Sequence, residues 1–144
     1  MKPRPKTLNM VERAVIAQEW RGTVPAARIH ILIGDGGVHM VNQAGKVLFV
    51  VLGAALEMQM DPDRPELRII RASVNALETQ AENDEVNPVH RAAISSGLEA
   101  CVRLLPEIPH PVIVRSACDL HLKLKNGHAM ASDFKERLGR LVAA

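Results

Sequence analysis

The segment Gly34-Asp35-Gly36-Gly37 is the first candidate for chemistry, because glycine-rich loops can surround a phosphate with backbone N–H groups. A Walker loop has four residues between its two glycines and continues with Lys and Ser or Thr, whereas Gly37 is followed by Val38 and His39. A dinucleotide fingerprint needs a glycine at position 39. We therefore interpret the segment as a turn between two apolar runs.

The six histidines are candidate metal ligands, and metal sites in helical proteins use side chains three or four residues apart on one helix face. No two histidines have that spacing, and no HExxH motif occurs; the six are His30, His39, His90, His110, His121 and His128. We predict no metal site and no cofactor. A metal site assembled from distant segments stays open as an alternative.

No serine or cysteine occurs in a motif that would pair it with a general base. No GxSxG motif is present, and Cys101 lies on an apolar helix face, where burial raises a thiol pKa. Cys101 and Cys118 are 17 residues apart without CxxC spacing, which favours two reduced thiols over a disulfide. We predict no catalytic residues, while a small helical enzyme or metal-binding protein remains the second alternative function.

The elements that would position these residues are predicted to be helices. Aromatic residues make up only 2% of the 144-residue chain, so the core must consist of aliphatic side chains. Apolar residues between 38 and 60 cover every side of a helix, which is typical of a buried one. We expect an all-α, single-domain bundle of six or seven helices around a buried central helix at about 38–60.

Capping and turn residues delimit the other helices. Asn9 with Glu12 has capping-box spacing, Asn87-Pro88 is a typical helix start, and Asn126-Gly127 is a typical helix end. Val11, Ala14 and Val15 fall on one stripe of the first helix. The expected ranges are 9–22, 24–33, 65–81, 88–105, 112–125 and 133–141.

The range 29–41 permits a second interpretation. Residues 29–33 form a short β-branched run, which fits a strand as well as a helix. Asp35-Gly36 is a strong two-residue turn signal, so a short hairpin near 29–41 remains possible.

Charge is distributed unevenly along the chain. The net charge is +4 over residues 1–30 and +3 over residues 109–144, but −4 over residues 61–108. We expect residues 1–7 to form a flexible basic tail. If the two ends meet, they could bind nucleic acid phosphates. The candidate residues for this patch are Lys2, Arg4, Lys6, Arg21, Arg28, Lys123, Lys125, Lys135, Arg137 and Arg140.

Protein binding requires the least special chemistry. Met58 and Met60 are two residues apart, so one should face away from the side that the other buries, and an exposed methionine would mark a partner-binding surface. We expect a non-enzymatic regulator, adaptor or chaperone-like protein that acts through protein–protein contacts and forms a homodimer. A nucleic-acid-associated regulator is the alternative.

The sequence also indicates a compartment. The basic start of the chain lacks the apolar stretch of a secretory signal, and the longest apolar run, 47–56, is too short for a membrane span. We expect a cytoplasmic, bacterial protein without a membrane partner.

Overall fold

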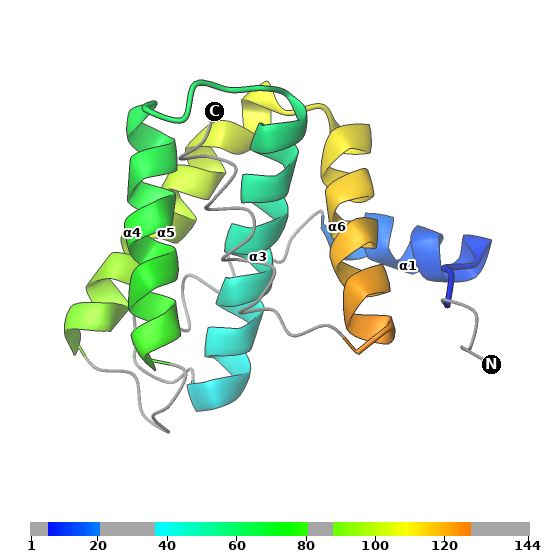
Figure 1. The fold of residues 1–144 in the computed structure, drawn as a ribbon, viewed down its shortest axis with the longest axis horizontal. Helices are drawn as coiled ribbons and strands as arrows, with labels where there is room; N and C mark the ends of the chain where they lie inside the picture. The colour runs from blue at the N-terminus through cyan, green and yellow to red at the C-terminus, as the bar shows by residue number, and fades with distance from the viewer. Residues whose placement is uncertain (1–5, 21–36, 81–87, 128–144) are drawn as a thin grey trace.

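The computed structural model describes residues 6–20, 37–80 and 88–127, and the regular structure within these ranges is entirely helical. The elements are α1 (Met10–Glu19), α3 (Gly37–Glu57), α4 (Pro65–Gln80), α5 (Pro88–Leu104), the short 3-10 helix η1 (Leu105–Glu107) and α6 (His110–Lys125) (Figure 1). The predicted all-α class is confirmed for these residues. The expected helices 24–33 and 133–141 lie outside the described residues, so the helix count stays a prediction.

The hairpin considered for residues 29–41 is wrong in its last part. Residues 37–41 belong to α3, and residues 29–36 lie outside the described ranges. The helix begins at Gly37 because the apolar residues over 38–57 have helical spacing. A two-stranded hairpin could not bury these side chains.

Helix α3 packs against α4, α5 and α6. Every side chain from Val47 to Ala55 has no exposed surface, and Gly53, which has no side chain, is buried as well. The helix ends at Glu57, three residues before the predicted end. There the N–H of Met58 donates to Ala54 O at 3.0 Å, and Gln59 takes a left-handed φ of 56° that no helix can continue.

Helices α4 and α5 form the closest helix pair (Figure 1), and their contact depends on a glycine. A Cβ atom at Gly97 would lie 2.2 Å from Ser73 Oγ and 2.3 Å from Ser73 Cβ. The hydroxyl of Ser73 is itself buried and donates to Ile94 O at 3.5 Å. The two backbones can therefore approach this closely only because position 97 has no side chain.

Helix α6 is joined to α3 by a buried hydroxyl. Ser116 Oγ donates to Val50 O at 2.7 Å, next to Ala117, which has no exposed surface. Helix α6 begins at His110, two residues before the predicted start, because Pro111 fits the first turn of a helix. It ends where Gly127 takes a positive φ of 84°.

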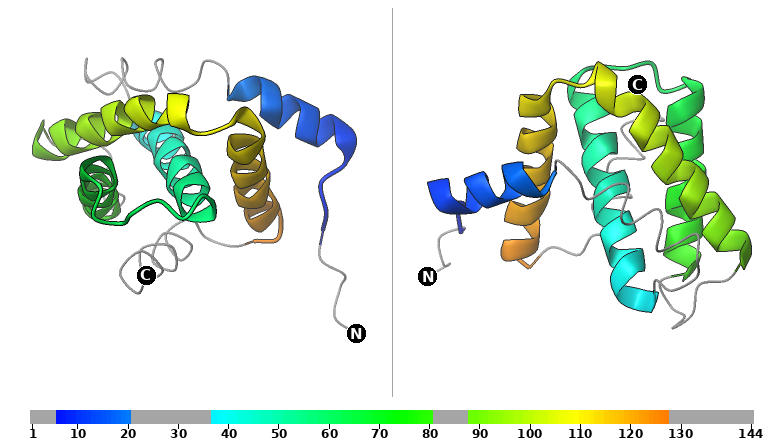
Figure 2. Two further views of the ribbon diagram at one scale, coloured as in Figure 1. Left: turned by 90° about the horizontal axis from the view of Figure 1, so that it is seen from above. Right: turned by 180° about the vertical axis from the view of Figure 1, so that it is seen from behind.

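Helix α1 lies at the edge of the molecule, where it packs against α6 and extends away from the bundle (Figure 2). The predicted capping box is confirmed: Glu12 N–H donates to Asn9 Oδ1 at 2.8 Å, and Asn9 N–H donates back to Glu12 Oε1 at 3.4 Å. Leu8 and Ile16 are the buried residues of this region. The apolar stripe of Val11, Ala14 and Val15 is exposed instead.

Candidate functional site

An open groove of about 580 Å³ lies between α1 and the last two turns of α6. Its wall on the N-terminal side consists of Leu8, Val11, Glu12, Val15 and Ile16. Four of these five side chains are apolar. Within α1, Val11 and Val15 are four residues apart, as are Glu12 and Ile16, and this spacing places each pair on one side of the helix. We call this cavity the α1–α6 groove.

The opposite wall of the groove comes from α6. It consists of His121, Leu124 and Lys125, and Leu124 also packs against the core. Two charged residues are among the lining residues, and they face each other across the groove. Lys125 Nζ lies 3.0 Å from Glu12 Oε1 and 3.1 Å from Glu12 Oε2. Five of the eight lining residues are apolar, and the charges of the one acid and the one lysine compensate each other.

Three apolar side chains of α1 are highly exposed. Met10 is 86% exposed, Val11 is 72% exposed and Val15 is 56% exposed. Val11 and Val15 are one helical turn apart and also line the groove. Soluble proteins leave single apolar residues on the surface, but a contiguous exposed stripe beside a cavity is typical of an interaction site.

Polar contacts hold the start of this region to the end of α6. Lys6 N–H donates to Asn126 Oδ1 at 2.8 Å, and Asn126 Nδ2 donates to Lys6 O at 3.1 Å. Lys125 Nζ donates to Thr7 O at 3.2 Å as well as to Glu12. We call these contacts of Lys6, Thr7, Glu12, Lys125 and Asn126 the polar clamp. It fixes the two walls of the groove relative to each other.

The polar clamp also changes the electrostatics of its carboxylate. The hydrogen bond from Lys125 lowers the pKa of Glu12 below its ordinary value, and the Asn9 N–H adds to the effect. Both donors stabilise the ionised form. Glu12 is therefore ionised at neutral pH and available to pair with Lys125.

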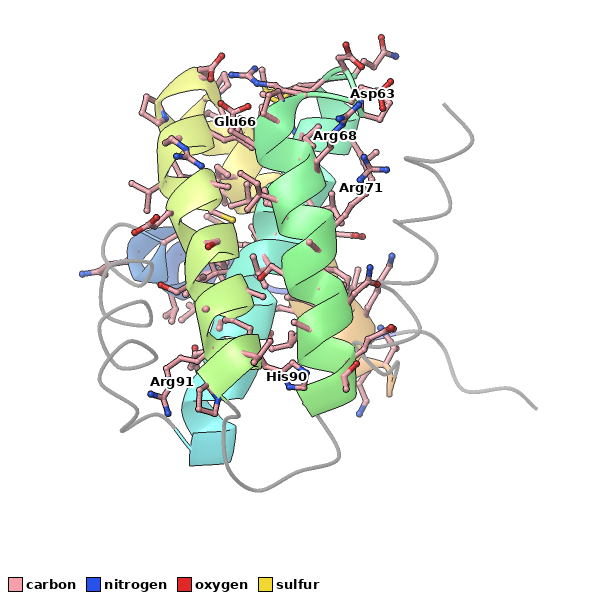
Figure 3. All side chains as sticks on the ribbon, turned by 90° about the vertical axis from the view of Figure 1, so that its left-hand side faces the viewer. Asp63, Glu66, Arg68, Arg71, His90 and Arg91 are labelled. Carbon is pink, nitrogen blue, oxygen red and sulfur yellow. The ribbon has the colours of Figure 1, made fainter. Side chains whose placement is uncertain are left out.

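A second group of charges lies at the far side of the molecule. Figure 3 places Asp63, Glu66 and Arg68 at one end of the α4–α5 pair and His90 and Arg91 at the other. At the first end Arg64 pairs with both Glu66 and Glu107, and these carboxylates raise the pKa of Arg64.

These pairs connect the segment before α4 to η1. Arg71 strengthens the same segment by donating to Pro62 O at 3.2 Å, and Arg115 pairs with Glu57 at 2.7 Å. Since these cations bond to the chain's own oxygen atoms, we assign this end a structural role.

The two cysteines lie in the packed interior, where a thiol is unreactive. Both cysteines are free and buried, and burial raises the pKa of each thiol, for Cys101 far above its usual range. Glu107 and His110 have Glu-x-x-His spacing, but Pro109 and the end of η1 separate them, and Glu107 pairs with Arg64. Within residues 6–20, 37–80 and 88–127, no cluster of His, Cys, Asp and Glu could hold a metal ion.

Three of the ten residues proposed for a basic patch lie in the described ranges: Lys6, Lys123 and Lys125. The structure brings Lys6 next to the end of α6 through Asn126. Lys125 bonds to Glu12, and Lys123 Nζ lies 3.6 Å from Asp119 Oδ2. The N-terminal segment and the end of α6 therefore meet, but both α6 lysines have carboxylate partners.

The two methionines proposed for partner binding differ in burial. Met58 is 38% exposed, whereas Met60 packs against the core. They lie at the end of α3, outside the residues that line the α1–α6 groove. The groove was not predicted from the sequence, although the stripe of Val11, Ala14 and Val15 was its available signal.

No helix of the described ranges combines the length and the apolar character that crossing a membrane requires. Comparison with models of protein families, with curated proteins and with solved structures finds no match for this chain.

Proposed function

We propose that this protein is a non-enzymatic helical adaptor or regulator that binds an amphipathic helix of a partner protein in the α1–α6 groove. The proposal includes the cytoplasmic location expected from the sequence. The observation that carries it is the exposure of Val11 and Val15 beside an apolar groove.

The apolar stripe of α1 faces solvent in the isolated chain, which costs free energy because apolar surface is in contact with water. A partner that covers the stripe removes this cost. A helix contacts another helix through side chains that are one turn apart, and the exposed valines of α1 have this spacing. The stripe therefore favours binding of a protein over binding of a polar small molecule.

The length of α1 sets the length of a helix that could pack along it. Helix α1 has ten residues and is about 15 Å long, which matches two to three turns of a partner helix. Helix-in-groove complexes bury apolar anchors at positions i, i+4 and i+7 of the bound helix. The Glu12–Lys125 pair crosses the groove and leaves no net charge there, so the partner helix should present an apolar face.

Site-specific photo-crosslinking in the source cells tests this proposal. A photo-reactive amino acid replaces Val11, and in a matched control it replaces Val102, an exposed valine of α5 that is 42% exposed. We expect discrete protein adducts from position 11 that are absent from position 102. Equal adducts from both positions, or none from position 11, would contradict the proposal.

Nucleic acid binding is a second candidate function, favoured by the contact between Lys6 and Asn126. This contact brings Lys6 to the end of α6, and Lys2 and Arg4 precede Lys6 in the sequence. Phosphate binding by such a surface weakens steeply as salt rises.

A mobility shift with any duplex at ~50 mM salt tests the second candidate. Charge reversal of Lys123 and Lys125 should abolish the shift, and reversal of Arg68, an exposed residue of α4, should not. No shift at this salt concentration would exclude the nucleic acid reading.

A further inference from the structure

We infer that the partner helix is α1 of a second copy of this chain, so that the α1–α6 groove is the interface of a two-fold homodimer. This inference rests on the proposed function, that the groove binds a protein helix. Helix α1 is itself a short helix with an exposed apolar stripe, which is the chemistry that the groove accommodates.

The shape of the surface is self-complementary. Val11 and Val15 protrude from α1 and at the same time form a wall of the groove beside it. In a two-fold interface the same surface serves both copies, so each copy must provide both the protruding part and the receiving part. The inferred two-fold interface therefore requires the valines of each α1 to lie over the groove of the other copy.

The charges also suit a symmetric contact. Near a two-fold axis each charged group approaches its own copy, so an uncompensated charge would repel itself. Glu12 and Lys125 are the charged residues that line the groove, and they pair within one copy at 3.0 Å. Arg13 is two residues from Val11 and Val15, about 200° around the helix from each. It therefore points away from the stripe.

The size of the surface predicts a weak dimer. Eight residues line the groove in each copy, whereas a standard stable interface uses about 20–30 residues on each side. Dimerisation through this surface should therefore depend on concentration, with the monomer dominant on dilution.

Sedimentation velocity of the purified full chain from ~5 to ~500 μM tests the inference, because mass action shifts a weak dimer over such a range. We expect the average mass to rise from 15.7 kDa towards twice that value. Val15→Glu should keep the monomer mass at every concentration, because two carboxylates would meet in the apolar contact. Val102→Glu, the matched surface control, should dimerise like the unmodified chain.

Circular dichroism shows whether each variant folds, and Val15→Gln replaces Val15→Glu if the charged variant does not. Dimerisation that survives both Val15 substitutions, or that Val102→Glu abolishes, would overturn the inference. A chain that is monomeric throughout while the Val11 probe captures a different protein would overturn it too, but would leave the proposed function intact. A monomeric chain with no adduct at Val11 would contradict both.

Discussion

Helices α3 and α1 differ in how the rest of the molecule holds them. The apolar side chains of α3 from Val47 to Ala55 are buried, and α3 packs against α4, α5 and α6. Helix α1 packs against α6 at the edge, keeps Val11 and Val15 exposed, and is tied down by the polar clamp. Buried helices set global stability, whereas elements with few apolar contacts open locally at a lower cost and often bind partners.

The largest difference should appear on truncation of core residues. Leu52→Ala removes a side chain of α3 with no exposed surface and should lower the free energy of unfolding by about 2–5 kcal/mol. Val15→Ala on α1 should change it by less than about 0.5 kcal/mol, since surface substitutions rarely exceed this. Urea denaturation measures both. Similar losses for the two variants would show that α1 belongs to the core.

Overpacking of the α4–α5 contact should have the next largest effect. Gly97→Ala places a methyl group against Ser73 and should cost about 1–3 kcal/mol in unfolding free energy. Ser73→Gly in the same chain should recover part of this loss, because the contacting atoms are then absent. Ser96→Ala, one residue away and exposed, is the control and should be nearly neutral. A neutral Gly97→Ala would contradict the close approach of the two helices.

A smaller and local effect should follow loss of the polar clamp. Asn126→Ala removes both hydrogen bonds to the Lys6 backbone, each worth about 0.5–1.5 kcal/mol. Amide hydrogen exchange of α1 should accelerate, while exchange of α3 stays unchanged. Asn75→Ala, an exposed asparagine of α4, controls for loss of an amide. Equal acceleration in α3 would mean that the two regions unfold together.

The smallest effect should come from pH. The pKa of Glu12 is lower in the folded chain than its unfolded value of about 4.3. Its contribution to the clamp is therefore present above the unfolded value and is lost as pH falls through the folded one. Exchange in α1, after correction for intrinsic rates, should show a drop in protection over this acidic range. Glu12→Gln should remove that drop, and a drop that persists in the variant would assign it to another group.

The sequence predicts most of the described helices because their boundaries depend on local chemistry. Pro88 begins α5, the Asn9–Glu12 box begins α1, and Gly127 follows α6, as expected from residue types alone. Helix α3 ends before the predicted residue because Gln59 takes the left-handed conformation, which the sequence does not mark with a glycine. Close approaches such as Gly97 on Ser73 depend on tertiary packing, which helical periodicity does not specify.

The candidate site was less predictable than the helices. The periodicity of Val11, Ala14 and Val15 indicates an apolar stripe, but it does not say whether another part of the chain covers that stripe. The groove exists because Asn126 bonds to Lys6 and Lys125 bonds to Thr7, although more than a hundred residues separate the partners in the sequence. The two-residue spacing of Met58 and Met60 predicts that one is exposed and the other buried, and Met58 is the exposed one. The spacing does not indicate the groove.

Hydrogen exchange of the unmodified chain at low and at high protein concentration tests the central claim most directly, namely that the α1 edge is a docking surface and not part of the core. We predict slow exchange in α3 at both concentrations, and exchange in α1 that is fast in dilute solution and slows as the concentration rises. Slow exchange in α1 at every concentration, matching that of α3, would contradict the account.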